Sequence, residues 1–161
     1  MKKIITLLML VAVAVAAQAQ SLTGKNWFTN QSDNDIDGGL LMMFDPEGAC
    51  AVSLLIVKTN DNKTIAFTYM VPGMYSRVGD SLKVTLIPKM AEVNCDIEGM
   101  SANEIELMQP VIDEQKQQLK VSLAEDFDWD EEPFTIDELT DSRLVLTDSE
   151  GAKMVFVHVE E

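Results

Sequence analysis

The chain has little of the side-chain chemistry on which most enzymes depend. Its 161 residues include one histidine and two cysteines, whereas a serine or cysteine nucleophile ordinarily needs a histidine held beside it. The single histidine, His158, lies in an expected strand near the C-terminus, and no motif surrounds it. A strand histidine that is satisfied in the core or faces solvent explains this position better than a catalytic base. No pair of carboxylates stands out either, so we expect no enzymatic activity and no catalytic residue.

Cations are also scarce. The sequence contains 12 Lys+Arg against 27 Asp+Glu, a net charge of −15, and it has no basic cluster. Nucleic acids and anionic membrane surfaces bind through clustered Lys and Arg, so neither is an expected partner. The sequence also lacks glycine-rich phosphate loops and His/Cys metal-ligand spacings. We therefore expect no cofactor.

Only one apolar run approaches the length of a membrane span, and it lies at the start of the chain. Ile4 to Ala17 follow two lysines and end at the small-x-small sequence Ala17-Gln18-Ala19, which is typical of a secretory signal peptide. The run is too short to cross a bilayer, although a retained membrane anchor is the alternative interpretation. We predict a signal peptide over residues 1–19 and one domain over residues 20–161, periplasmic or secreted.

Export would change both the net charge of the chain and the chemistry of its cysteines. Without Lys2 and Lys3, 10 Lys+Arg oppose 27 Asp+Glu, a net charge of −17. Cys50 and Cys95 could form a disulfide that persists after export, and a loop of this length would gain about 3–4 kcal/mol. Two buried free thiols that pack as small apolar residues are the alternative. The sequence leaves both open, because it does not show the distance between the Cα atoms.

A period of two dominates the stretch from Cys50 to Ile97 and predicts a half-buried antiparallel sheet. Residues 64–71, 81–87 and 90–98 each place apolar side chains on one face and polar ones on the other. The predicted inward faces are Ile65, Phe67, Tyr69 and Val71, then Leu82, Val84 and Leu86, then Ala91, Val93, Cys95 and Ile97. Gly79-Asp80 predicts a hairpin, whereas Val71-Pro72-Gly73 predicts a break or bend.

The period changes at Ser101, which forms a capping-box signature with Glu104 and predicts the start of a helix. Pro110 lies within the pattern and predicts a kink or two shorter helices. The helix has an apolar stripe, which consists of Ile105, Met108, Ile112, Leu119 and Leu123. We expect this stripe to pack on the sheet. A membrane surface or a partner is the alternative, and the low basic content of the helix argues against a membrane.

Strands resume over residues 133–138, 142–146 and 153–159. The prediction is therefore a mainly β chain of eight or nine strands, with one helical insertion before the last of them. No internal repeat or linker divides it.

Several short motifs resemble those of one known protein family. They are Gly24-x-x-Trp27 at the first strand, the up-and-down strand series with a late helix, and the closing pattern Phe134–Thr140, Leu144–Asp148 and Gly151. Together these resemble the lipocalin-like proteins, above all the small exported bacterial lipocalin-like domains. Lipocalins usually have one residue between that glycine and tryptophan, whereas two stand here. The resemblance implies an antiparallel up-and-down barrel of about eight strands, with Trp27 as a plug at one end.

A barrel of eight strands can be filled by side chains or can hold one small ligand. The resemblance implies an interior ligand of no particular identity. An apolar lining with a polar handle is typical of such a pocket, but an ordinary filled core has the same composition. The candidate ligand-binding residues of the barrel lining are Leu54, Phe67, Tyr69, Leu82, Val84 and Leu86.

Two acidic runs have the alternation found in calcium loops. Asp33, Asp35 and Asp37 are followed by Gly38, as in the first half of a D-x-D-x-D-G loop. The twelfth loop position, where a bidentate glutamate belongs, is Phe44. The second run, residues 126–130, alternates aspartates with Phe127 and Trp129. A solvated acidic loop is the alternative in both cases.

Two functions from different classes follow from these observations. The first is an exported non-catalytic lipocalin-like protein that binds a small apolar molecule in the barrel. The second is a protein-interaction module with a filled barrel, which engages a basic partner through its acidic loops or its helix. A ligand-sized cavity at one barrel end favours the first, and a filled barrel with an exposed apolar patch favours the second. A calcium-stabilised domain is a third, weaker hypothesis.

Overall fold

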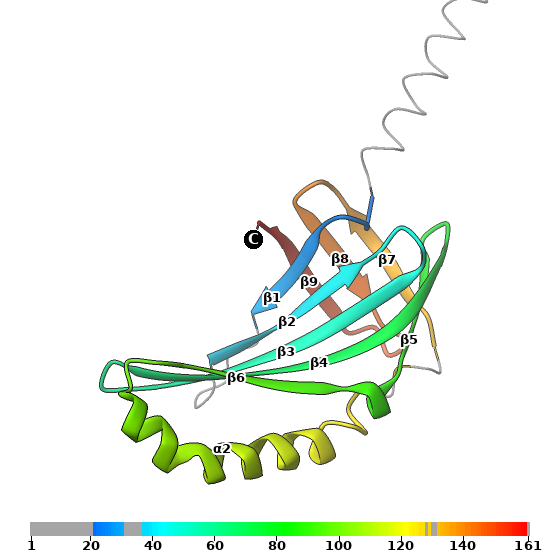
Figure 1. The fold of residues 1–161 in the computed structure, drawn as a ribbon. Coiled ribbons are helices and arrows are strands. Elements are labelled where there is room, and N and C mark those ends of the chain that lie inside the picture. The colour runs from blue at the N-terminus through cyan, green and yellow to red at the C-terminus, as the bar shows by residue number, and fades with distance from the viewer. Residues whose placement is uncertain (1–20, 31–36, 128, 130–131, 161) are drawn as a thin grey trace, which may run out of the picture.

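The protein folds into a closed antiparallel barrel with one long helix beside it (Figure 1). The computed structural model describes residues 21–30, 37–127, 129 and 132–160; the predicted signal peptide lies outside them. Their elements are β1 (Asn26–Asn30), β2 (Asp37–Phe44), β3 (Ala49–Asn60), β4 (Lys63–Val78), β5 (Ser81–Leu86), η1 (Pro88–Met90, a 3-10 turn), β6 (Glu92–Glu98), α2 (Ala102–Ser122), β7 (Phe134–Leu139), β8 (Arg143–Thr147) and β9 (Lys153–Val159).

Eight of the described strands close the barrel in the order β3-β2-β1-β9-β8-β7-β5-β4, and β4 pairs with β3 again. The predicted fold is confirmed: it is mainly β, with an eight-stranded antiparallel barrel and a single helix before the last strands. The ninth strand, β6, pairs with β4 alone among the described strands.

Short turns set the register of the longest strands. Asn60 pairs with Lys63, so Asp61 and Asn62 alone make the β3–β4 turn. Their φ angles are 48° and 63°, the type I′ conformation whose twist matches that of the flanking strands. The predicted Gly79-Asp80 hairpin is confirmed, because Val78 pairs with Ser81 across it.

Pro72 neither breaks nor ends its strand. β4 runs without interruption through it, from Lys63 to Val78. The prediction of a break was wrong because Pro72 lies where β4 changes partner, after the last pair with β6 and just before the first pair with β5. Its missing N–H is therefore not needed on that side, while its carbonyl oxygen accepts a hydrogen bond from Ile87 N at 2.9 Å. The backbones of β4 and β5 approach closely at this point, since a Cβ at Gly73 would collide with the carbonyl oxygen of Thr85.

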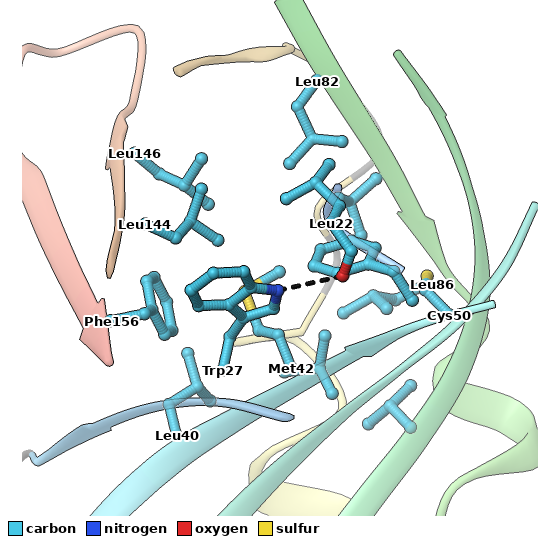
Figure 2. Close-up of a cluster of buried hydrophobic side chains, with 14 of the residues drawn as sticks. Leu22, Trp27, Leu40, Met42, Cys50, Leu82, Leu86, Leu144, Leu146 and Phe156 are labelled. Atoms are coloured by element: carbon cyan, nitrogen blue, oxygen red, sulfur yellow. Dashed lines mark hydrogen bonds between the residues drawn. The ribbon is translucent and has the colours of Figure 1, made fainter. Parts of the chain in front are cut away.

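The barrel interior is filled by side chains. Figure 2 shows the Trp27 ring in the middle of this cluster, with Leu144, Leu146 and Phe156 on one side and Leu22 over it. The largest side chains with almost no exposed surface are Trp27, Tyr69, Phe156, Met42, Leu82, Leu144, Leu146, Val52, Val71 and Val84. Packing of this kind supplies most of the stabilisation of a domain, at about 25 cal/mol per Å² of apolar surface.

The helix packs on β6, on the side of the molecule away from β1 and β9 (Figure 1). Its predicted start is confirmed: Ser101 and Glu104 form a full capping box. Pro110 does not divide it, and one helix continues to Ser122. The predicted stripe is its covered side, on which Ile112 is buried and the other four members are half-buried. Gly99 lets the chain reach this position, because a Cβ there would collide with the carbonyl oxygen of Asn62.

Of the two alternatives for Cys50 and Cys95, the disulfide is excluded, and both cysteines are free. Cys50 lies opposite Gly73 of β4, whereas Cys95 lies opposite Phe67. Six residues of β4 separate those positions, about 20 Å along a strand, and a disulfide tolerates about 7 Å between its Cα atoms. Burial raises the pKa of the Cys50 thiol to about 11, so Cys50 packs as a small apolar residue.

Candidate functional site

The predicted lining residues belong to the packed interior. Leu82, Val84, Leu86 and Tyr69 are buried members of the core, and Leu54 is partly buried against it. Phe67 is buried farther along β4, opposite Ile56 of β3. The sequence therefore placed all six on the inward face. The structure fills the space between them with other side chains of the core, Trp27 and Met42 above all.

The segment before β1 closes one end of the barrel. Its Gly24 N donates a hydrogen bond to Phe44 O, at the end of β2. Leu22 is buried here, and the indole Nε1 of Trp27 donates to its carbonyl oxygen at 3.0 Å (Figure 2). Trp27 itself is fully buried, and the ammonium of Lys25 lies 5.5 Å from its ring centre. Trp27 thus lies within the core, and Leu22 covers it.

The segment after α2 closes the opposite end, where β8 ends and β7 begins. Phe127 is buried 5.2 Å from the ring centre of Tyr69, and Trp129 stacks on Phe127 at 5.7 Å. Phe134 continues this aromatic ladder at 5.6 Å from Trp129. A surface hollow of about 520 Å³ lies outside the ladder, between it and the Asp148–Glu150 turn. The aromatic side chains therefore separate this hollow from the barrel axis.

One buried polar atom in this region has no hydrogen-bond partner among the described residues. It is the hydroxyl oxygen of Tyr69, a fully buried residue. Burial also raises the pKa of this phenol. An unsatisfied buried hydroxyl costs about 1–3 kcal/mol, so Tyr69 adds polarity to the interior at the expense of stability.

A largely apolar opening of the described surface lies between η1 and the end of α2. We call it the η1–α2 groove; its volume is about 680 Å³, and its lining is largely apolar. Leu86 forms its buried floor, while Ile87 and Val121 are 39% and 76% exposed beside it. The lining residues are Leu86, Ile87, Pro88, Lys89, Lys120, Val121, Ala124 and Glu125. A volume within the usual range of about 300–1,000 Å³ and an apolar wall are the features of a small-molecule site.

Two lysines give the groove a charged rim. Lys89 comes from η1 and Lys120 from the last turn of α2, while Glu125 is the acidic residue of the lining. Among the described residues, no ion pair engages either lysine. The long methylene stems of such side chains extend an apolar wall while the ammonium groups stay in water.

The remaining candidates form no second site. His158 pairs with Trp27 across β1 and β9, with the ring centres 6.1 Å apart. Of the first calcium run, Asp33 and Asp35 lie outside the described residues and Asp37 begins β2; the second run lies partly outside them too. In the part of the chain that the structure describes, no three His, Cys, Asp or Glu side chains gather around a metal-sized space, and no helix has the length and apolarity to cross a membrane.

Sequence reasoning missed the groove. Ile87 ends the predicted strand 81–87 on the side opposite its inward residues, and Val121 lies outside the helical stripe, so neither period marks them as part of one site. One signal was available: Val121 interrupts the polar side of α2, and a large apolar residue on a polar face is a candidate contact. The two residues are 34 positions apart in the sequence, and only the packing of α2 on β6 brings them to one opening.

No protein-family model matches the chain, and a search of the curated proteins finds no match.

Proposed function

We propose that the protein is an exported, non-catalytic binding protein of the lipocalin-like kind, and that it takes a small apolar molecule in the η1–α2 groove. The observation that carries this proposal is the position of free apolar surface. The barrel axis is filled, whereas the groove leaves Ile87 and Val121 open to solvent above the buried Leu86. The eight-stranded barrel agrees with the lipocalin resemblance, but the proposed site lies outside the barrel.

Burial of apolar surface would drive binding. A ligand that removed about 200 Å² of apolar surface from water would gain about 5 kcal/mol before the cost of lost freedom. Such a balance supports only weak binding, with a Kd of about several hundred micromolar or higher. Tight binding would need further polar contacts.

The test is a titration with N-phenyl-1-naphthylamine, a neutral dye that fluoresces in apolar surroundings. We expect the double variant Ile87→Gln/Val121→Gln to bind it at least fivefold more weakly, because both side chains border the groove. Both are exposed, so the fold should tolerate the changes. The matched control is Leu107→Gln, which alters an 81% exposed residue of the same helix outside the groove lining.

Equal dye binding by the groove variant and the unmodified protein would overturn the proposed site. Native mass spectrometry of the protein purified from its own host gives a second readout. A co-purifying small molecule that the groove variant loses would support the proposal. If the groove variant retains the molecule, the groove is not its site, and the barrel interior becomes the candidate site again.

The outer face of α2 supports a second function, protein interaction. Leu107 and Val111 are 81% and 51% exposed, and they share one face because they are four residues apart. Glu106 and Glu114 lie near them and are exposed, so a cationic amphipathic helix is the complementary partner. Such a synthetic peptide should bind the protein and lose affinity with Leu107→Ser/Val111→Ser but not with the groove variant. Because neither variant changes a charge, unchanged affinity in both would indicate charge attraction alone.

A further inference from the structure

We propose that the ligand of the η1–α2 groove is a single-chain amphiphile with an anionic headgroup, whose tail lies in the groove and whose headgroup meets Lys89 and Lys120. This inference rests on the proposed function and specifies its ligand. It is argued from the distribution of charge around the groove.

Cations gather here in an otherwise acidic protein. Outside the predicted signal peptide the sequence has 10 Lys+Arg against 27 Asp+Glu. Three of those ten, Lys89, Lys116 and Lys120, border the groove or the hollow beside it. Among the described residues, none of the three belongs to an ion pair, whereas Lys25, Lys63, Arg143 and Lys153 each have a carboxylate partner.

Lys120 marks the boundary between an apolar and a polar space. On one side it lines the η1–α2 groove, and on the other it lines a hollow of about 320 Å³. That second hollow is bordered by Lys116, Gln117 and the 91–94 segment at the start of β6, so its wall is mostly polar. An amphiphile needs this arrangement, an apolar trough that ends at unpaired cations.

The sign of the charge follows from the same residues. Glu125 lines the groove and Glu92 lines the neighbouring hollow. Among the residues that line the groove and the hollow, three ammonium groups stand against these two carboxylates. An ammonium without a partner forms a charge-assisted hydrogen bond with a carboxylate or sulfate, whereas a cationic headgroup would be repelled. The groove volume suits a monomeric chain better than a two-chain lipid, so a free amphiphile is the expected occupant.

The experiment compares three ligands that share one tail. Dodecanoate, dodecanol and dodecyltrimethylammonium are titrated into the full protein below their micelle-forming concentrations, with displacement of the naphthylamine dye as the readout. We expect dodecanoate to bind at least tenfold more tightly than dodecanol, and dodecyltrimethylammonium to bind most weakly. Lengthening the carboxylate chain should raise affinity about fourfold per buried methylene group.

Charge-neutral variants assign the preference to the rim. Lys89→Gln/Lys120→Gln should remove the advantage of dodecanoate and leave dodecanol unchanged. The matched control, Lys58→Gln/Lys83→Gln, removes the same charge from exposed lysines of β3 and β5 and should keep the preference.

The two proposals fail in different ways. Equal affinities of the unmodified protein for dodecanoate and dodecanol would overturn the headgroup inference and leave the apolar groove standing. Absence of binding by all three ligands would overturn both. Binding of anionic phospholipid vesicles without binding of monomeric dodecanoate would replace the free amphiphile with a membrane surface and overturn the inference as stated.

Discussion

The barrel and its helix-covered extension are built from the same strand but are packed to different degrees. In the barrel, inward side chains from several strands pack against one another, and Val71 of β4, Trp27 of β1 and Phe156 of β9 have no exposed surface. In the extension, which consists of residues 63–68 of β4, β6 and α2, one layer of helix covers the sheet. Of the described side chains of α2 only Ile112 is buried, and the inward residues of β6 are half-buried.

This difference indicates where binding can evolve in a small barrel. A filled axis at close-packed density has no room for a ligand without loss of core contacts. A helix that rests on the sheet through a narrow stripe leaves grooves at its margins, and the η1–α2 groove is one of them. We therefore expect the barrel to supply stability and the extension to supply the binding surface.

The largest expected effect is that of Trp27→Ala. The change removes a fully buried ring from the middle of the barrel core and should lower the free energy of unfolding by about 3–5 kcal/mol. Urea unfolding followed by tyrosine fluorescence and circular dichroism measures it. Trp27→Phe, which keeps an aromatic ring but loses the hydrogen bond to Leu22, should cost less; equal costs would show that the bond rather than the packing matters.

The matching change in the extension is Ile112→Ala. It removes the buried side chain of α2. Because the single helical layer can relax toward the sheet, we expect the free energy of unfolding to fall by about 2 kcal/mol. Hydrogen exchange should show faster exchange of α2 amides and little change in β8 and β9. Equal acceleration throughout the barrel would show that the two regions unfold as one unit, and the contrast drawn above would be wrong.

Tyr69→Phe tests the interior at the barrel end. Removing a hydroxyl that has no hydrogen-bond partner in the described part of the chain while keeping the ring should leave the free energy of unfolding unchanged or raise it by up to about 1 kcal/mol. Thermal unfolding measures the difference. A loss above about 1 kcal/mol would show that the hydroxyl has a partner in solution, such as a bound water, and that the barrel end is more polar than its packing indicates.

The smallest expected effect concerns Glu104, which pairs with Lys63 at the start of α2, and it depends on pH. Hydrogen bonds from the Lys63 ammonium and from the backbone and hydroxyl of Ser101 lower the pKa of Glu104 from 4.5 to about 2. Because the folded pKa is the lower one, this contribution is present above pH 4.5 and is lost as the pH falls toward 2. Amide protection in the first turns of α2 should decline across that range.

Glu104→Gln should remove this part of the pH dependence, since the amide does not titrate. The loss must be followed locally, because a hydrogen-bonded pair with Lys153 also lowers the pKa of Asp137 in the barrel. An unchanged decline of α2 protection in Glu104→Gln would assign it to another group.

Much of the strand pattern could be predicted because each inward face follows from local alternation. Ile65 to Val71 and Leu82 to Leu86 alternate regardless of what they pack against, and the Ser101–Glu104 capping box needs four neighbouring residues. Pro72 was misjudged because its tolerance depends on the partner of β4 at that point. The sequence could not decide the disulfide, because inward-facing cysteines on two strands can still be offset along the sheet.

The sequence by itself determined the period of each element, the side that faces inward and the excess of acidic charge, because these depend on neighbouring residues and on composition. Only the tertiary structure decided how the barrel axis is occupied, since Trp27 and Met42 come from the first two strands whereas Phe156 comes from β9, the last described strand. It also decided where free apolar surface remains. The groove forms from the ends of β5 and α2, and its existence depends on how closely a helix approaches a curved sheet, a quantity that no local pattern contains.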